Sequence, residues 1–237
     1  MPQTARRASP RPDSGVSGAV DDLQLTMGLS PTTVSRLPVY LRELELLSQA
    51  GVETISSTGL AEVVGVTPSQ LRKDLSHLGS YGTRGVGYHI AGLQAQIGRE
   101  LGTARGWPVV IIGVGNLGRA LAGYAGFSSR GFRIAALVDP DPAVIGTVVH
   151  GVEVSDLAEL EAVITRTKAT IAVLATPPAA AQSVVDRVVH QGVTSILTFA
   201  ATVLAVPDGV IVRKVDLGQE LQILAYYEQR KSEEVVR

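Results

Sequence analysis

The sequence predicts an α/β chain in which a small helical domain precedes a larger domain built on a parallel sheet. Three observations support this prediction. Short helical patterns and a glycine-rich hairpin fill the first half, strands alternate with helices from Trp107 onward, and 237 residues exceed one ordinary domain.

Composition excludes several kinds of site. The chain has no cysteine, which excludes disulfides, zinc sites with cysteine ligands and thiol catalysis. Its 4 histidines are scattered, so no metal site is expected. A net charge of −1 gives no global basic field, and any contact with nucleic acid must come from a few placed cations.

No targeting or membrane segment is expected. Residues 1–30 are rich in Pro, Ser, Gly and Arg and have no apolar stretch, which is typical of a disordered arm. Nowhere does the chain run about 18 apolar residues without a charge. We therefore expect a cytoplasmic protein with no membrane partner.

Residues 31–88 are predicted to form a winged-helix domain. Apolar residues at three- and four-residue spacing predict a first helix, with Ser35 as a possible cap and Gly51 just past its end. Ala61, Gly65 and Leu71 then fall at the small, turn and core positions of a helix-turn-helix.

The second helix of that motif has a complete start signal. Thr67 is placed to cap it, Pro68 takes its first position, and Gln70 completes a capping box. The helix would bury Leu71, Leu75 and Leu78. Asp74 would repel phosphate if it faced DNA, so we expect it to turn sideways.

The other side of this helix offers side chains that suit a DNA major groove. They are Ser69, Gln70, Arg72, Lys73, Ser76 and His77. The following stretch, SYGTRGVGYH, fits a wing from which Tyr81 and Arg84 would contact DNA. A solvated helix on a packing domain is the open alternative.

Residues 89–106 are predicted to form a connecting helix, and residues 107–215 a Rossmann-like domain. Continuous apolar strands alternate with helices there, which indicates a parallel sheet covered on both faces. The predicted strands are 109–112, 134–138, 170–175 and 195–199, and the predicted helices are 119–126, 157–165 and 179–190. Residues 216–237 are predicted to form an amphipathic helix and a tail.

A glycine-spaced turn follows the first of these strands. Gly113 permits a tight turn, Gly115 lets backbone amides approach a pyrophosphate, and Gly118 lets the helix pack close to the strand. Asp139, which closes the next strand, would bind the ribose hydroxyls and favour NAD(H) over NADP(H). The expected cofactor-binding residues are Gly113, Val114, Gly115, Asn116, Leu117, Gly118, Asp139, Thr176 and Pro177.

This domain has little room for an enzyme's substrate site. A dehydrogenase usually adds an acid or base and an anion clamp, whereas His150, His190, Lys168 and Lys214 have no obvious partner. The cofactor is therefore expected to act as a signal. Since NADH carries a neutral nicotinamide, apolar walls formed by Phe199, Ala200 and Val203 would favour it over NAD⁺. A plain core role for these residues is the open alternative.

Four stretches together resemble the Rex family of bacterial redox-sensing repressors: SRLPVYLRELELL, GVTPSQLRKDLSHLGSYGTRGVGY, GVGNLGRAL and VDLGQELQILAYY. The resemblance covers nearly everything after the arm. It implies a homodimer that binds a palindromic operator, represses respiratory genes and releases DNA when NADH binds. Ala201 departs from the family, which often has proline there.

The resemblance also implies a switch. Arg42, Tyr124 and Asp216 would link the helical domain, the cofactor and the partner subunit, and Tyr124 would lie at the cofactor. The last helix, residues 219–231, would insert into the partner. Two interpretations from other classes stay open: a small NAD-dependent oxidoreductase with an accessory helical domain, and a cofactor-binding module whose helices bind protein.

Overall fold

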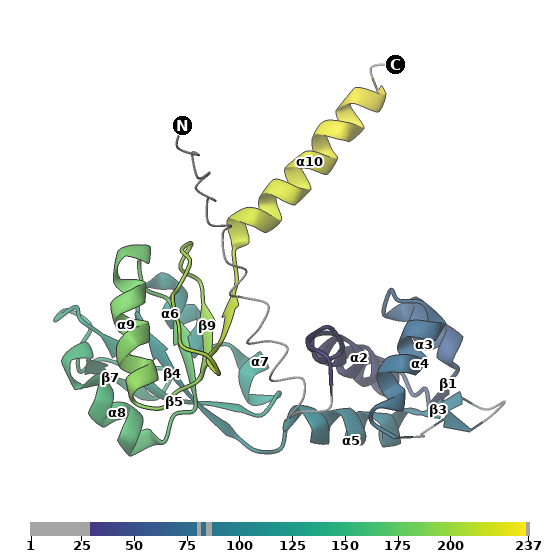
Figure 1. Ribbon diagram of the computed structural model, residues 1–237, viewed down its shortest axis with the longest axis horizontal. Coiled ribbons are helices and arrows are strands. Elements are labelled where there is room, and N and C mark those ends of the chain that lie inside the picture. The colour runs from purple at the N-terminus through teal and green to yellow at the C-terminus, as the bar shows by residue number, and fades with distance from the viewer. Residues whose placement is uncertain (1–28, 80–81, 84–86, 236–237) are drawn as a thin grey trace, which may run out of the picture. The chain divides into compact units, whose positions relative to one another are not determined.

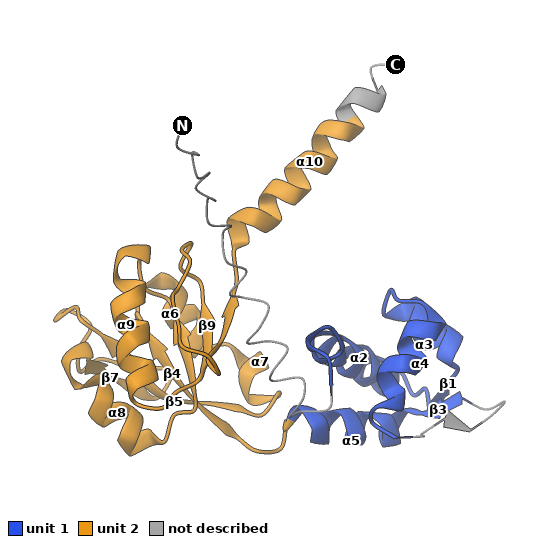
Figure 2. Ribbon diagram, viewed as in Figure 1, with its two compact units in different colours: residues 1–101 blue, residues 102–237 orange. Residues whose placement is uncertain are grey.

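The computed structural model describes residues 29–79, 82–83 and 87–235. It divides into two compact units, residues 1–101 (unit 1) and 102–237 (unit 2), shown in Figures 1 and 2. The predicted arm lies outside the described residues except for Leu29 and Ser30. No described helix has the length and apolar character needed to cross a membrane.

Unit 1 combines helices with a small antiparallel sheet. Its described helices are α2 (Pro31–Gln49), α3 (Ser57–Val63), α4 (Pro68–Ser76) and α5 (Ile90–Leu101). Strands β1 (Thr54–Ile55), β2 (Gly82–Thr83) and β3 (Gly87–His89) pair in the order β1-β3-β2. The helix-turn-helix is thus α3 and α4, and β2 and β3 form the wing.

The start of α2 differs from the prediction. Ser30 rather than Ser35 caps this helix, since the Ser30 hydroxyl accepts a hydrogen bond from the Thr33 amide at 3.1 Å. Pro31 then takes the first helical position, where its missing N–H costs nothing.

The helix-turn-helix follows its sequence signals closely. Gly65 adopts a φ of +71° in the turn, and Ala61 is fully buried. Thr67 caps α4 as predicted, and the three predicted leucines of the core are buried. The second half of the capping box does not form, because the Gln70 side-chain amide donates instead to Asp74 at 2.8 Å.

The helix α5 belongs to the core of unit 1. Its buried residues Ile90, Leu93 and Ile97 pack in one cluster with Leu37 and Leu44 of α2. The segment predicted as a connector therefore contributes to the helical domain, and unit 1 extends to residue 101.

Unit 2 is a sheet with helices on both faces (Figure 1). The strands are β4 (Trp107–Ile112), β5 (Phe132–Asp139), β6 (Val148–Val149), β7 (Val152–Asp156), β8 (Ile171–Leu174), β9 (Ser195–Thr198) and β10 (Ile211–Lys214). The helices are α6 (Asn116–Ala122), α7 (Ala125–Ser128), η1 (Leu157–Glu159), α8 (Leu160–Thr167), α9 (Pro178–His190) and α10 (Leu217–Val235).

The strand order β10-β9-β8-β4-β5-β7-β6 places β4 at the centre of the sheet. All neighbouring strands are parallel except β6, which pairs antiparallel with β7. From β4 the chain moves first to β5 on one side and later to β8 on the other. Such a reversal opens a crevice at the carboxyl ends of the two strands, where ligands bind in this class of sheet.

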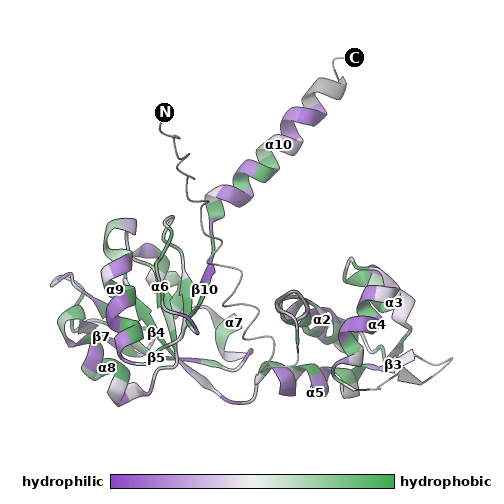
Figure 3. Ribbon diagram, in the orientation of Figure 1, coloured by the Kyte–Doolittle hydropathy of each residue, from purple (hydrophilic) through white to green (hydrophobic). Residues whose placement is uncertain are grey.

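Both faces of the sheet are buried, as the continuous apolar strands predict. Val110 and Ile112 of β4 pack with α8 and α9, whereas Val109 and Ile111 belong to the cluster on the opposite face. Figure 3 shows the hydrophobic strands at the centre of unit 2. This double burial holds the ends of β4 and β8 in fixed register.

Three parts of unit 2 differ from the prediction. The helix expected over 119–126 begins at Asn116 and breaks at Gly123 and Tyr124 before the short α7. The sequence VVHGVEV forms the β6–β7 hairpin, whose turn residues His150 and Gly151 both have positive φ. The edge strand β10 was not predicted.

Candidate cofactor and DNA-binding sites

The glycine turn between β4 and α6 is tight at two positions and open at the third. Gly113 has a φ of +94°, and a Cβ there would lie 2.6 Å from the Ala175 carbonyl oxygen. A Cβ on Gly118 would overlap the Gly113 carbonyl oxygen. A Cβ on Gly115 would meet no atom within 4 Å, so the space beside Gly115 is free for a ligand.

Asp139, expected to bind ribose, holds the turn together in this chain. It is 9% exposed, and its Oδ2 accepts a hydrogen bond from the Val114 amide at 2.5 Å. Its Oδ1 accepts from the Asp141 amide at 2.8 Å. Each carboxylate oxygen keeps a second lone pair, so Asp139 can support the turn and still accept from a ribose hydroxyl.

Thr176 lies across the crevice from this turn. It follows β8, and its amide nitrogen would lie 3.2 Å from a Cβ on Gly113. The Thr176 hydroxyl oxygen is buried and has no hydrogen-bond partner among the described residues. The exposed Pro177 is the cap of α9, which has no side-chain capping hydrogen bond.

These residues fit a dinucleotide on two grounds. The turn excludes side chains at Gly113 and Gly118 and leaves open space at Gly115, which suits a pyrophosphate drawn against backbone. The buried Thr176 hydroxyl offers a donor that the fold itself leaves unused. When bound, the cofactor would supply a nicotinamide whose charge depends on its oxidation state.

The expected apolar wall follows β9. The Phe199 amide donates to the Leu174 carbonyl at 3.0 Å, which ties this segment to the end of β8. Phe199 is half-buried and Ala200 is 2% exposed. Val203, expected in the same wall, is 94% exposed and forms no part of it.

Tyr124 lies apart from the glycine turn within unit 2. It is half-exposed at the break between α6 and α7, with its ring edge-on to Phe127 at 5.2 Å between centroids. It lines a groove of about 480 Å³ together with residues that include Phe132, Arg133 and His150. No residue of the glycine turn lines this groove.

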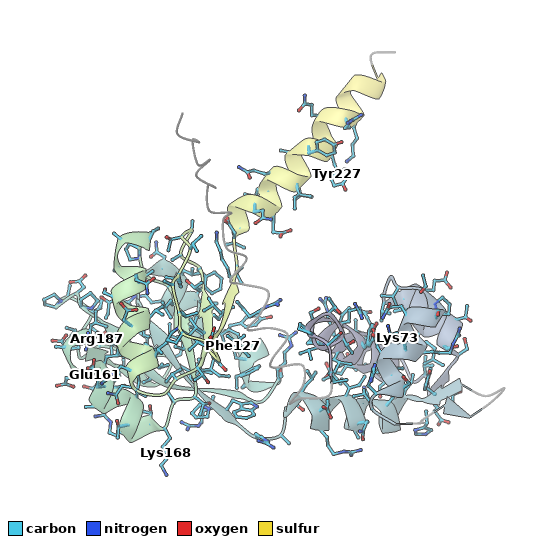
Figure 4. The ribbon with its side chains drawn as sticks, in the orientation of Figure 1. Lys73, Phe127, Glu161, Lys168, Arg187 and Tyr227 are labelled. Atoms are coloured by element: carbon cyan, nitrogen blue, oxygen red, sulfur yellow. The ribbon has the colours of Figure 1, made fainter. Side chains whose placement is uncertain are left out.

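The exposed face of α4 carries the side chains expected to contact DNA. Ser69, Arg72, Lys73 and Ser76 are exposed, as is His77 at the C-cap, whereas Gln70 is half-buried against Asp74. Figure 4 labels Lys73 on this helix. Tyr81 and Arg84 lie outside the described residues.

Asp74 points into the core of unit 1, whereas we expected it to turn sideways. Its side chain is 1% exposed, and Arg36 of α2 forms an ion pair with it through Nε at 2.6 Å and Nη2 at 2.7 Å. Tyr40, Thr33 and Gln70 donate at 2.7, 3.1 and 2.8 Å.

Burial alone would raise the pKa of Asp74, but the hydrogen bonds from Arg36, Tyr40 and Gln70 outweigh it and hold this pKa at about 2. Burial and the bond to Asp74 raise the pKa of Tyr40 to about 12. The sequence analysis did not predict that Thr33, Arg36 and Tyr40 bind the Asp74 carboxylate. Their spacing, which places polar groups on one face of α2, was the available signal.

The remaining residues of the expected switch lie on separate elements. Arg42 is exposed on α2. Asp216 precedes α10, accepts a hydrogen bond from the Gln219 amide at 3.2 Å and pairs with Lys214 at 3.2 Å, and both contacts lower the pKa of Asp216. Several large apolar side chains of α10 are exposed, among them Leu217, Leu221, Leu224 and Tyr227.

In the described part of the chain, no three histidine, aspartate or glutamate side chains gather as metal ligands would.

Family models match both units. Residues 28–76 match a model described as the N-terminus of putative DNA-binding proteins, and residues 105–202 match a CoA-binding domain. The first match covers α2 to α4, and the second covers strands β4 to β9 with the glycine turn.

Curated relatives agree with both matches. The chain is 60% identical over 207 residues to the redox-sensing transcriptional repressor Rex of Streptomyces avermitilis, covering 87% of this chain and 82% of that protein. It is 44% identical to Rex of Desulfitobacterium hafniense, covering 85% and 96%.

Solved structures show the same architecture. The crystal structure of RSP in complex with β-NAD⁺ and operator DNA superposes with a TM-score of 0.81 and 37% identity, covering 86% of this chain and 94% of RSP. RSP in complex with β-NADH gives a TM-score of 0.79 and 36% identity, with 86% and 96% covered. RSP is itself described as a Rex-family repressor. This chain therefore belongs to the Rex family of redox-sensing transcriptional repressors.

Proposed function

We propose that this chain is a transcriptional repressor that senses the NADH/NAD⁺ ratio. It binds a palindromic operator as a homodimer in the cytoplasm and releases the operator when NADH binds. The observation that carries this proposal is the presence, in one chain, of an exposed cationic face on α4 and, after β4, a glycine turn with open space beside Gly115. The RSP complexes with NAD⁺, NADH and operator DNA support both halves.

On the cofactor side, the backbone of residues 113–118 would receive the pyrophosphate beside Gly115, with Thr176 and Pro177 on the opposite wall. Asp139 would accept from the adenosine ribose and exclude the 2′-phosphate of NADP(H) by charge repulsion. Phe199 and Ala200 would border the nicotinamide. Removing a neutral ring from water costs less than removing a cationic one, so this wall favours NADH.

On the DNA side, Arg72 and Lys73 would contact the major groove and its phosphates, with Ser69, Gln70, Ser76 and His77 beside them. Tyr81 and Arg84 of the wing would add contacts next to this groove. A dimer with two such helices matches the two half-sites of a palindrome, whose spacing then depends on the separation of the helices.

The dimer would form through α10. Its exposed apolar side chains, Leu217, Leu221, Leu224 and Tyr227, form a surface that water does not favour and that a second copy would cover. Figure 3 shows hydrophobic and hydrophilic segments alternating along α10. Arg42, Tyr124 and Asp216 would then report cofactor binding between the units and across the dimer.

The test is fluorescence anisotropy on an operator that the protein selects from random-sequence DNA, titrated with NADH and separately with NAD⁺. Release by NADH at concentrations where NAD⁺ has little effect supports the proposal. Operator binding that ignores both cofactors would contradict it. Binding with no dependence on salt would favour the interaction module, since phosphate contacts release counterions.

The oxidoreductase alternative needs its own assay. NADH is incubated with small carbonyl compounds, and its absorbance is followed. Sustained oxidation that Gly115→Ala abolishes would favour an enzyme, whereas a stable NADH signal together with operator release favours the sensor.

A further inference from the structure

Asp74 joins two helices that otherwise pack against different neighbours. The helix α2 packs mainly along α5, and α4 packs mainly against α3. The Asp74 carboxylate of α4 receives hydrogen bonds from Thr33, Arg36 and Tyr40, all on α2. These contacts connect two segments that are more than 30 residues apart in the chain.

The contacts are directional, whereas the surrounding core is not. Leu37, Leu71 and Leu75 pack in one apolar cluster, and apolar burial depends on area rather than on angle. A helix held by leucines alone is positioned by the shape of the packing, without any directional contact that fixes its rotation. Hydrogen bonds from Arg36 and Tyr40 to a buried charge weaken steeply with misalignment, so they select one register of α4.

The carboxylate also cannot exchange these partners for water. Its side chain is 1% exposed, whereas that of Arg36 is 27% exposed. Removing one partner of a buried ion pair leaves an uncompensated charge, which makes every alternative placement of α4 unfavourable.

The position of Asp74 relates this lock to the DNA-facing side chains. It directly follows Arg72 and Lys73 on α4, and those two project from the exposed face while Asp74 projects into the core. Any rotation of α4 that moves Asp74 moves both cations by a similar amount. Contacts to base edges tolerate shifts of only about 0.5 Å.

We propose that Asp74 is a positioning residue for operator recognition: its buried carboxylate locks α4 to α2, so that Arg72 and Lys73 are presented in one register and move together with α2. This inference rests on the proposed function and extends it. Asp74 itself touches no DNA. Its effect is on sequence discrimination, and it acts through the helix that carries the reading side chains.

Charge and positioning predict opposite results for Asp74→Asn. Removing a negative charge next to two cations should strengthen binding to any DNA through the phosphates. Loosening the register of α4 should weaken binding to the operator, because operator affinity requires aligned base contacts. A fall in operator affinity therefore cannot come from the lost charge.

The experiment measures the Kd for the selected operator and for a scrambled duplex of equal length, at one salt concentration, with the full-length protein. Asp74→Asn is compared with Tyr40→Phe, which keeps the ring and the net charge but removes one donor from α2. The matched control is Glu161→Gln, since Glu161 of α8 forms a bidentate pair with Arg187 of α9 in unit 2 (Figure 4). Circular dichroism and a NADH titration verify that each variant is folded.

We expect the ratio of operator to scrambled affinity to fall about tenfold in Asp74→Asn and about threefold in Tyr40→Phe, with scrambled binding equal or stronger. NADH affinity should stay within twofold of the wild type, and Glu161→Gln should keep the wild-type ratio. If Asp74→Asn does not fold, Tyr40→Phe decides. A wild-type ratio in the folded variants would overturn the inference, and a wild-type protein with no operator preference would overturn the proposed function as well.

Discussion

Replacing Gly115 by alanine should remove cofactor binding while leaving the sheet domain folded. A Cβ at this position meets nothing within 4 Å, and the φ of −70° suits any residue. Alanine is a poorer cap for α6 than glycine by up to about 1 kcal/mol. Alanine also reduces the conformational entropy of the unfolded chain, which stabilises the folded protein by roughly 0.4 to 1 kcal/mol. The net change in unfolding free energy should therefore stay within about 0.5 kcal/mol.

Gly113→Ala is the steric contrast in the same turn. Its φ of +94° is a conformation that alanine resists, and its Cβ would lie 2.6 Å from the Ala175 carbonyl oxygen. Left-handed backbone and overpacking together should cost about 3 kcal/mol. For a chain of this length, that cost should lower Tm by roughly 6 to 12 °C.

The assay pairs thermal unfolding with a NADH fluorescence titration. Gly115→Ala should change Tm by no more than about 2 °C and weaken NADH binding about tenfold or more, because its methyl group occupies the space proposed for the pyrophosphate. The Gly115→Ala variant should still bind the operator, but NADH should no longer release it. NADH affinity within twofold of the wild type would refute the placement of the cofactor, and a Tm as low as that of Gly113→Ala would refute the steric argument.

Four further perturbations test separate parts of the proposal. Lys73→Ala should make the negative slope of log affinity against log salt concentration shallower by about 0.9 per subunit. An unchanged slope would rule out a phosphate contact by Lys73. Asp139→Asn keeps an acceptor for the Val114 amide but loses the charge, so paired titrations should show weaker rejection of NADPH; an unchanged NADH/NADPH preference would contradict the ribose role. Because the pKa of Asp74 lies below its ordinary value of 3.8, its contribution is present above pH 4 and should disappear between pH 4 and 2. The free energy of unfolding should fall by about 2 kcal/mol between pH 4 and 2. If the unfolding free energy of Asp74→Asn falls as steeply over this range, the prediction is wrong. Leu224→Glu should give monomers in sedimentation. A variant that remains dimeric would contradict the proposal that α10 forms the dimer interface.

Periodicity predicted the elements that bury a complete face. The strands at β4, β5, β8 and β9 and the helix-turn-helix follow from apolar spacing, because both sheet faces and one helix face lie in cores. The edge strand β10 was not predicted, since its side chains are largely exposed and give no such signal. The β6–β7 hairpin depends on a positive φ at His150, and a histidine in the sequence does not by itself predict this conformation.

The sites divide in the same way. The glycine spacing and the exposed face of α4 are local patterns. In the structure the glycines form a turn after β4, and Ser69, Arg72, Lys73 and Ser76 are exposed, whereas Gln70 is half-buried. Repulsion between carboxylate and phosphate predicts only that Asp74 turns sideways. Its burial and its donors on α2 were not predictable, because the donors come from residues 34 to 41 positions away and depend on how the two helices meet.

The strength of the Asp74 contacts limits how the repressor can switch. Moving an equilibrium from 1:99 to 99:1 requires about 5.5 kcal/mol of differential binding, or about 2.7 kcal/mol from each of two cofactors in a dimer. Breaking one partner from a buried ion pair costs about 3 to 5 kcal/mol, which would add to this requirement. We therefore expect release of the operator to leave the bond between Asp74 and Arg36 intact. In the proposed dimer, α2 and α4 should then move as one body, and NADH would act by changing the separation of two recognition helices rather than the shape of either.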